Sequence, residues 1–199
     1  MKVLVTGVTG QLGSEVAARF RQLGHEVIAA DRQVLDFLQP ARAAAVIRAQ
    51  QPDWVINCAA YTQVDKAESE PGQAFTVNRD TPAQLAQAVA EYDGQLLQLS
   101  TDFVFDGTQT RPYVEDDATN PLGVYGSSKL AGEQAVQREL PDAVIVRTAW
   151  VYGVHGHNFV KTMLRLATAG RPLRVVSDQR GTPTWTRDIV AAIVALVDQ

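Results

Sequence analysis

The sequence predicts a doubly wound α/β fold, in which a mostly parallel β-sheet carries helices on both faces. Short apolar runs alternate with longer amphipathic segments along the chain, as strands and crossover helices do. A glycine-rich turn follows the first apolar run and opens the first amphipathic segment. The length of 199 residues suits one sizeable hydrophobic core rather than two ordinary domains.

The individual elements follow from their patterns. The apolar runs are the expected strands, at 2–6, 26–30, 54–57, 95–99, 143–147 and 173–176. Segments with apolar residues at helical spacing are the expected helices, at 11–23, 40–50, 80–92, 123–140, 158–169 and 186–197. The stretch 100–120 is left as one long irregular loop, and such a loop in a compact domain is more often functional than accidental.

Composition and charge exclude several classes. Hydrophobic residues make up 46% and charged residues 20% of the chain, which argues against disorder. The 18 basic and 22 acidic residues form no basic block, which argues against a nucleic-acid or anionic-membrane partner. We find neither a secretory signal nor an apolar run near the ~20 residues of a membrane span, and therefore expect a cytoplasmic protein. The lone Cys58 cannot form an internal disulfide, and its apolar neighbours predict a buried structural thiol.

The glycine-rich turn has the GxxGxxG spacing of Gly7, Gly10 and Gly13. Such glycines permit a tight turn, let a pyrophosphate approach the backbone and let the helix pack closely on the strand, so the turn predicts a Rossmann-type dinucleotide site. The acid expected to bind the adenosine ribose is Asp31, which follows the second strand close to the expected ~20 residues after the turn. Arg32 beside it would instead neutralise a 2′-phosphate, so both NADH and NADPH stay open.

A second group of residues predicts proton transfer. Tyr125 and Lys129 lie four apart on an expected helix and therefore share one face, although an exposed surface pair would show the same spacing. A lysine ammonium one turn away would lower the phenol pKa from its usual ~10 and prepare it for proton transfer at a substrate C–O group. Thr101 follows the strand 95–99, so its hydroxyl is expected at the same sheet edge as the glycine turn, where it would hold the carbonyl oxygen that Tyr125 protonates.

These groups together resemble the extended short-chain dehydrogenases/reductases, and within them the dTDP-4-dehydrorhamnose reductase family. The resemblance covers essentially all 199 residues. It is most specific at 64–68 (VDKAE) and 147–152 (RTAWVY). The other matching segments are the three glycines, 57–60 (NCAA), 69–71 (SEP), 100–107 (STDFVFDG), 121–126 (PLGVYG), the Tyr125/Lys129 pair and 178–184 (DQRGTPT).

The resemblance implies hydride transfer from NADPH or NADH to the C4 ketone of dTDP-4-dehydro-L-rhamnose, giving dTDP-L-rhamnose. It implies that Tyr125 donates the proton, that Thr101 orients the carbonyl and that Lys129 holds the nicotinamide ribose. With the turn residues above, the expected cofactor-lining set is Gly7, Gly10, Gln11, Leu12, Gly13, Asp31, Arg32, Asp36, Phe37, Ala59, Ala60, Tyr61, Tyr125 and Lys129. The residues expected to contact the sugar nucleotide are Thr101, Asp102 and Trp150.

The resemblance also bears on domains and partners. It implies a Rossmann domain over 1–199 that includes the beginning of a small substrate lobe at about 150–199, most of which is missing from this sequence. It further implies a homodimer and, in some members, Mg²⁺ binding, but we identify no metal ligands in this sequence.

Two other functions stay open on the sequence. One is a sugar-nucleotide epimerase or dehydratase, although Phe103 follows Asp102 where the dehydratases carry a glutamate. The other is a non-catalytic, dinucleotide-binding regulatory subunit. The intact Thr101, Tyr125 and Lys129 speak against that second function.

Overall fold

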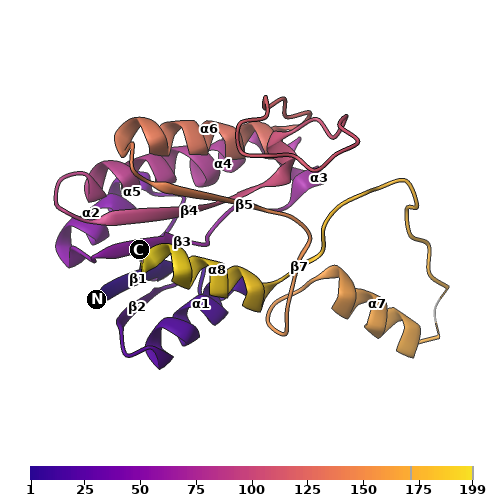
Figure 1. The fold of residues 1–199 in the computed structure, drawn as a ribbon, viewed down its shortest axis with the longest axis horizontal. Helices are drawn as coiled ribbons and strands as arrows, with labels where there is room; N and C mark the ends of the chain where they lie inside the picture. The colour runs from indigo at the N-terminus through magenta and orange to yellow at the C-terminus, as the bar shows by residue number, and fades with distance from the viewer. Residues whose placement is uncertain (171, 199) are drawn as a thin grey trace.

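The computed structural model describes residues 1–170 and 172–198. Its main sheet is parallel, with the strand order β2-β1-β3-β4-β5 (Figure 1). The chain places β2 on one side of β1 and β3 to β5 on the other, which confirms the doubly wound α/β fold. The strands are β1 (Lys2–Thr6), β2 (Glu26–Ala30), β3 (Trp54–Asn57), β4 (Gln95–Thr101) and β5 (Val144–Thr148). Strands β1, β3 and β4 are almost wholly buried, because helices cover both sides of a parallel sheet.

Helices pack on both faces of this sheet (Figure 1). On one face lie α1 (Gln11–Gln22) and α8 (Thr186–Val197), which bury Phe20 and Ile193 against the strands. On the other face lie α2 (Pro40–Gln50), α5 (Thr81–Val89) and α6 (Val124–Glu139), where Ile47 and Leu85 are fully buried. Each such side chain contributes roughly 1.5–3 kcal/mol by leaving water. No helix within the described ranges combines the length and the apolar character that crossing a membrane requires.

Several short elements of the structure were not distinguished by the sequence pattern. The expected helix 80–92 is preceded by a π-helical turn, Thr76–Asp80, which continues directly into α5. The segment before it forms α3 (Val64–Ala67) and α4 (Pro71–Phe75). A 3₁₀ turn, Asp102–Val104, follows β4 inside the expected loop 100–120. These one-turn pieces are too short to produce a clear apolar period in the sequence.

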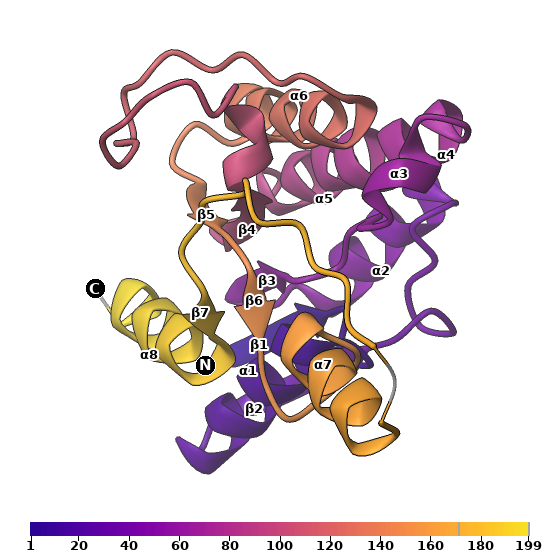
Figure 2. The same cartoon turned by 90° about the vertical axis from the view of Figure 1, so that its right-hand side faces the viewer.

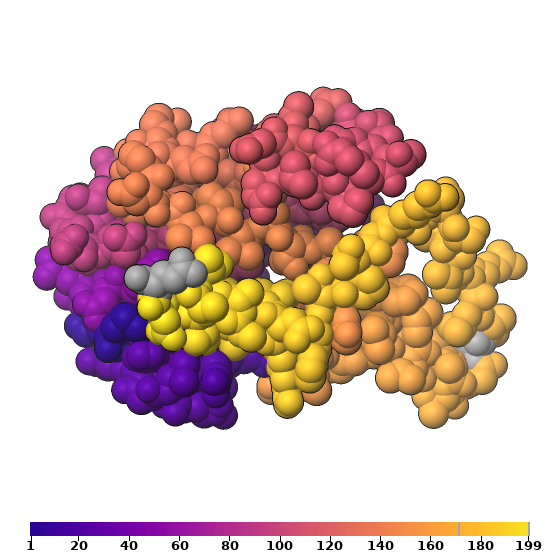
Figure 3. All heavy atoms as spheres, viewed as in Figure 1, coloured from indigo at the N-terminus to yellow at the C-terminus, as the bar shows by residue number. Residues whose placement is uncertain are grey.

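Part of the chain between β5 and α8 forms a small layer at the end of the sheet (Figure 2). There β6 (Val151–Tyr152) pairs in parallel with β7 (Thr184–Trp185), and α7 (Phe159–Thr168) buries none of its residues. Figure 3 shows α7 and the segment that follows it at one edge of the molecule. The substrate lobe expected at about 150–199 stays a prediction, and α8 within that range packs on α1.

The strand expected at 173–176 is wrong. This segment has no regular structure, and Leu173, Val175 and Val176 are all exposed. An apolar run becomes a strand only when a neighbouring strand accepts its backbone hydrogen bonds, and among the described residues no strand pairs with this segment.

Candidate active site

Three predicted groups meet at one edge of the sheet. The register aligns Thr6 of β1 with Asn57 of β3, and Asn57 with Gln98 of β4. The glycine turn, the segment 59–61 and Thr101 therefore leave the sheet at the same carboxyl edge, as the sequence analysis expects. This is the edge at which open α/β sheets bind ligands.

The glycine turn is shaped by contacts that admit no side chain. Gly7 has a φ of +66°, and a methyl group on it would come within 2.8 Å of the Cys58 carbonyl carbon. A methyl group on Gly13 would come within 2.7 Å of the Thr6 carbonyl oxygen. The two glycines thus allow the turn to pass over β3 and α1 to pack closely on β1.

The first turn of α1 is suited to a pyrophosphate. Its N-cap is Gly10, which has no side chain to occupy the free N–H groups, and the first turn contains no acidic residue. Free backbone donors and the positive end of the helix dipole both favour a bound anion. The cradle therefore fits the phosphates of a dinucleotide.

Gln11 connects this turn to the chain after β5. The Nδ2 of Asn158 donates to Gln11 Oε1 at 2.9 Å, and the Gln11 amide donates to the Val151 carbonyl at 3.4 Å. Asn158 also caps α7 by accepting from the Lys161 backbone N–H. Sequence analysis missed Asn158, whose contact with Gln11 spans most of the chain.

The two residues that bear on cofactor choice lie beside each other after β2. Asp31 Oδ1 accepts from the backbone amides of Gln33 and Val34, at 2.9 and 3.1 Å. These bonds fix the carboxylate at the end of the strand. Arg32 is exposed next to it. Both ribose binding and 2′-phosphate binding stay predictions.

Asp36 and Phe37 take part in the packing of α2. The Asp36 carboxylate accepts from the Leu38 backbone and the Gln39 side chain, and these hydrogen bonds lower its pKa. Phe37 is buried in the core, and its carbonyl accepts from the Thr81 hydroxyl at 2.7 Å. Their predicted contact with the cofactor is a prediction still.

A buried polar chain crosses the sheet directly below the site. The Thr6 hydroxyl donates to Asn57 Oδ1, and Asn57 Nδ2 donates to Gln98 Oε1, each at 2.6 Å. Gln98 then donates to the Leu99 carbonyl at 2.8 Å, while the Ala59 N–H donates to Thr6 and Asn57. Sequence analysis missed this chain, although polar residues at matching positions of otherwise apolar strands were a usable signal.

Lys129, on α6, bonds the same Leu99 backbone carbonyl that Gln98 does. Its side chain is only 4% exposed, and its Nζ donates to the Leu99 carbonyl oxygen at 2.6 Å. Burial lowers the Lys129 pKa to about 8, while the charge of Glu133 acts in the opposite direction. Burial also raises the pKa of the neighbouring Cys58 thiol to about 12, although the residue as a whole is only partly buried.

Tyr125 lies one turn before Lys129 on α6, close to Thr101. Burial raises the Tyr125 pKa, a hydrogen bond with Thr101 lowers it, and the charge of Asp102 raises it. The expectation that Lys129 lowers the Tyr125 pKa is therefore wrong for this structure, because desolvation dominates and the ammonium is directed to Leu99.

Neighbouring groups hold Thr101 and Asp102. Burial raises the Asp102 pKa, and the Thr101 hydroxyl donates to the Asp102 carboxylate at 3.1 Å. Thr101 also accepts from the Phe103 backbone N–H, and the Phe103 ring meets the Tyr125 ring edge-on, with their centroids 5.4 Å apart.

Asn78 in the π-helical turn fastens the segment after β3 to α6. Its side chain bonds both the N–H and the carbonyl of Tyr61, and it donates to the Ser128 hydroxyl at 3.0 Å. A methyl group on Gly132 would overlap the Asn78 carbonyl oxygen, so α6 lies against this turn. Sequence analysis missed Asn78 as well.

Trp150 lies on the outer side of the site. It has a φ of +44° and is 45% exposed, and Gly181 packs against its indole ring. Its ring is thus available to a ligand, but its predicted substrate contact stays a prediction. Among the described residues, no group of three or more His, Cys, Asp or Glu side chains is placed to hold a metal ion.

Known proteins resemble this chain in both sequence and structure. The family described as RmlD substrate binding domain matches residues 1–199. This chain belongs to that family. A curated relative, a dTDP-4-dehydrorhamnose reductase of Streptomyces griseus, is 48% identical over 194 residues, which are 97% of this chain and 64% of the relative. The chain thus spans about two thirds of the length of its curated RmlD relatives.

Solved structures of RmlD relatives share the fold. A dTDP-4-dehydrorhamnose reductase of Clostridium acetobutylicum is 42% identical, with a TM-score of 0.95 over 100% of this chain and 70% of that one. The enzyme of the same name from Bacillus anthracis, solved in complex with NADP, is 36% identical, with the same TM-score and coverage.

Proposed function

We propose that this chain carries the dinucleotide site and the proton-transfer residues of a reductase. The reaction is reduction by NADPH or NADH of the C4 ketone of dTDP-4-dehydro-L-rhamnose to the alcohol of dTDP-L-rhamnose. The observation that carries the proposal is the placement of Tyr125 and Thr101 beside each other, at the sheet edge where the glycine turn offers a phosphate cradle. The names of the RmlD relatives support the choice of substrate.

A bound reduced nicotinamide supplies the hydride that adds to C4. The Tyr125 hydroxyl donates its proton to the C4 oxygen, and its raised pKa keeps it protonated near neutral pH. When the substrate binds, the Thr101 hydroxyl turns from the Asp102 carboxylate, donates its hydrogen bond to the same oxygen and fixes its position. The Lys129 ammonium holds the ribose of the nicotinamide and, through the Leu99 carbonyl, fixes α6 against β4.

The remaining assignments complete the proposal. Gly10, Gln11 and Leu12 hold the pyrophosphate at the start of α1, and Ala59–Tyr61 line the opposite wall. Asp102 and Trp150 contact the sugar nucleotide beside Thr101. A homodimer and a cytoplasmic location stay predictions.

The choice between NADPH and NADH depends on Asp31 and Arg32. We propose that both cofactors bind, because the carboxylate suits ribose hydroxyls and the guanidinium suits a 2′-phosphate. The NADP complex of the Bacillus anthracis relative supports the second contact. Arg32→Ala would then weaken NADPH binding more than NADH binding, which fluorescence titration of the two cofactors measures.

The experiment that tests the function follows oxidation of each cofactor with dTDP-4-dehydro-L-rhamnose. It uses this chain and a chimera in which the C-terminal third of the Streptomyces griseus relative is joined to it. Turnover by either protein, abolished by Tyr125→Phe, supports the proposal. A folded chimera that binds cofactor without turnover contradicts it, and tightly held NAD⁺ after purification favours an epimerase.

A further inference from the structure

A buried ion pair lies directly behind Lys129. Glu133 follows Lys129 by one turn of α6 and is only 3% exposed. The Arg147 guanidinium from β5 binds the Glu133 carboxylate in bidentate fashion, with Nη2–Oε2 at 2.7 Å and Nε–Oε1 at 3.0 Å. The Arg147 side chain is itself only 26% exposed. Burying such a pair costs free energy of desolvation. Its position beside the proposed proton-transfer residues therefore points to a role in the site.

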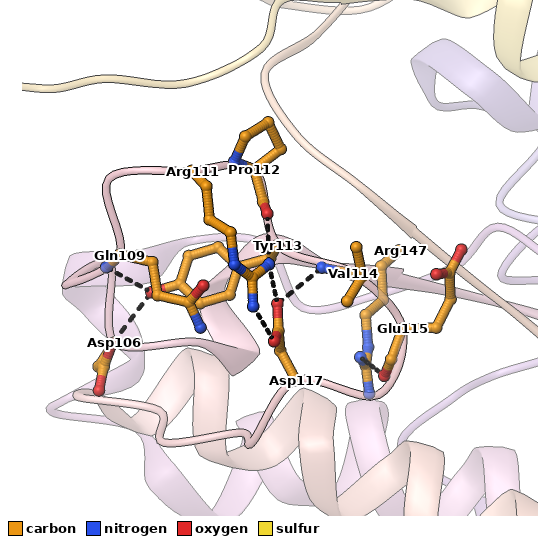
Figure 4. Close-up of polar contacts among 9 residues, drawn as sticks. All are labelled: Asp106, Gln109, Arg111, Pro112, Tyr113, Val114, Glu115, Asp117 and Arg147. Carbon is orange, nitrogen blue, oxygen red and sulfur yellow. Dashed lines mark hydrogen bonds and ion pairs between the residues drawn. The ribbon is translucent and has the colours of Figure 1, made fainter.

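The guanidinium is held on its other side by the loop that follows the proposed catalytic threonine (Figure 4). It lies 5.1 Å from the centroid of the Phe105 ring, and it donates to the Glu115 carbonyl oxygen at 3.3 Å. Phe105 in turn stacks on Tyr113, with ring centroids 4.2 Å apart and planes 11° apart. Arg147 is therefore fixed between α6 and the loop and has little freedom to leave Glu133.

The same loop is tied down at two further points, which Figure 4 also shows. The Asp106 carboxylate accepts from the Tyr113 hydroxyl at 3.0 Å and from the Thr108 hydroxyl at 2.7 Å. Arg111 pairs with Asp117 at 2.6 Å. These contacts make the loop a firm support for the Arg147 guanidinium.

The charged and polar groups around the Lys129 ammonium come from four parts of the chain. Glu133 faces it from its own helix, and the Cys58 thiol faces it from the segment after β3. From β4 it meets the neutral carbonyl of Leu99. Arg147 lies behind Glu133 on β5. Glu133 is thus the anion that opposes the effect of burial on Lys129.

We propose that Glu133 and Arg147 are positioning residues, which together fix the place and the charge of the Lys129 ammonium. Glu133 stabilises the ammonium by its negative charge. Arg147 engages both Glu133 oxygens, so the ammonium stays on the Leu99 carbonyl instead of turning back into a direct pair with Glu133. The value of this arrangement for proton transfer rests on the proposed function, whereas the arrangement itself does not.

The two residues act on Lys129 with opposite sign, which separates this proposal from a purely structural role. Loss of the Glu133 charge leaves Lys129 with burial and a nearby cation, and its pKa falls. Loss of the Arg147 charge removes a repelling cation and frees Glu133 for Lys129, and its pKa rises. Mere loosening of the fold would expose Lys129 in both variants and shift both pKa values toward the ordinary value.

The test is a pH titration of the protein carrying ¹³C-labelled lysine, observed by NMR at the lysine Cε. The four lysines, Lys2, Lys66, Lys129 and Lys161, give few signals, and Lys129→Arg assigns the one of interest. We expect Glu133→Gln to lower the Lys129 pKa by about one pH unit and Arg147→Met to raise it. Arg147→Lys should restore the value toward that of the wild type.

Matched controls keep the test decisive. Glu139→Gln removes a partly buried carboxylate at the far end of the same helix and should leave the Lys129 pKa unchanged. If Glu133→Gln does not fold, Glu133→Asp keeps the charge at a greater distance and should lower the Lys129 pKa by a smaller amount. An unchanged Lys129 pKa in a folded Glu133 variant, or shifts of the same sign in the Glu133→Gln and Arg147→Met variants, would overturn the proposal.

This titration needs neither cofactor nor substrate. A failed reductase assay would therefore leave the inference standing, and an unchanged Lys129 pKa would leave the reductase standing. Where the reductase is active, the fall in kcat/KM at high pH should begin about one pH unit lower in Glu133→Gln.

Discussion

Lys129 donates a 2.6 Å hydrogen bond from its Nζ to the backbone carbonyl of Leu99, two residues before Thr101. This bond joins the helix that carries Tyr125 to the strand that carries Thr101. The polar chain from Thr6 ends on the same carbonyl, through the side chain of Gln98. Tyr125, the proposed proton donor, and Thr101, the residue proposed to orient the carbonyl, are thus placed relative to each other by one backbone oxygen.

Tyr125→Phe should abolish reduction and leave cofactor binding nearly unchanged. The variant removes the proposed proton donor, while the glycine turn proposed to bind the pyrophosphate is untouched. Stopped turnover with an unchanged Kd for NADPH, measured by fluorescence titration, checks the assignment. An equal loss of binding and turnover would show that Tyr125 acts mainly in holding the site together.

Reductase activity should decline as the pH rises through about 8. The Lys129 pKa is lowered to that value by burial, so the ammonium is present below it and lost above it. A neutral lysine no longer offers a charged donor to the Leu99 carbonyl or to the nicotinamide ribose. The profile of kcat/KM against pH measures this, and a profile flat to pH 9.5 would contradict it.

Gly13→Ala and Gly7→Ala should each destabilise the protein by about 1–3 kcal/mol and weaken cofactor binding. The added methyl group meets backbone atoms in both cases, and Gly7 also has a positive φ. Urea unfolding and cofactor titration measure the two effects. Gly72→Ala in α4 is the matched control, because nothing lies within 4 Å of its added methyl group. Tight cofactor binding by Gly13→Ala would refute the assigned role of the turn.

Asn57→Ala should lower the free energy of unfolding by about 2–4 kcal/mol. It leaves the Thr6 hydroxyl and Gln98 Oε1 buried without the hydrogen bonds that they make to Asn57. Urea unfolding measures the change. Gln87→Ala, which removes an exposed glutamine from a surface pair, should stay within ±0.5 kcal/mol and serves as the control. A neutral Asn57→Ala would mean that the polar chain contributes little to stability.

Acid should loosen the loop that supports Arg147. Arg111 and the Val114 amide lower the Asp117 pKa from 3.8 to about 2, so the native state favours the ionised carboxylate. This stability is present above about pH 4 and is lost as the pH falls toward about 2. Asp117→Asn should therefore flatten the stability profile in that window, as followed by urea unfolding. An unchanged acid slope in the variant would exclude Asp117 as the group responsible.

The sequence predicted the central strands well for a physical reason. Strands β1 and β3 begin and end where their apolar runs do, because a strand covered on both faces has few polar positions. The run 173–176 has the same pattern without a neighbouring strand, and it forms no strand. A local apolar pattern shows that a segment can be buried, but it does not show which other segment will pack against it or pair with it.

The candidate site likewise contains features that local sequence patterns predict and features that they do not. The Tyr125 and Lys129 pair was predictable because four residues on a helix fix a shared face. The Glu133–Arg147 pair and the Asn158–Gln11 bond join segments that are distant in sequence, so no spacing indicates them. The Asn57–Gln98 bond follows from the polar positions of two apolar strands only once their register is known. The direction of the Tyr125 pKa also depends on burial, which a sequence does not give.

The most direct test of the account uses NADPH carrying two deuterium atoms at C4 of the nicotinamide, with dTDP-4-dehydro-L-rhamnose and the chimera described above. We predict a dTDP-L-rhamnose product with one deuterium at C4 of the sugar, seen by mass spectrometry and NMR, and no product from Tyr125→Phe. A product without deuterium at C4, or deuterated product formed at the wild-type rate by Tyr125→Phe, would contradict the account.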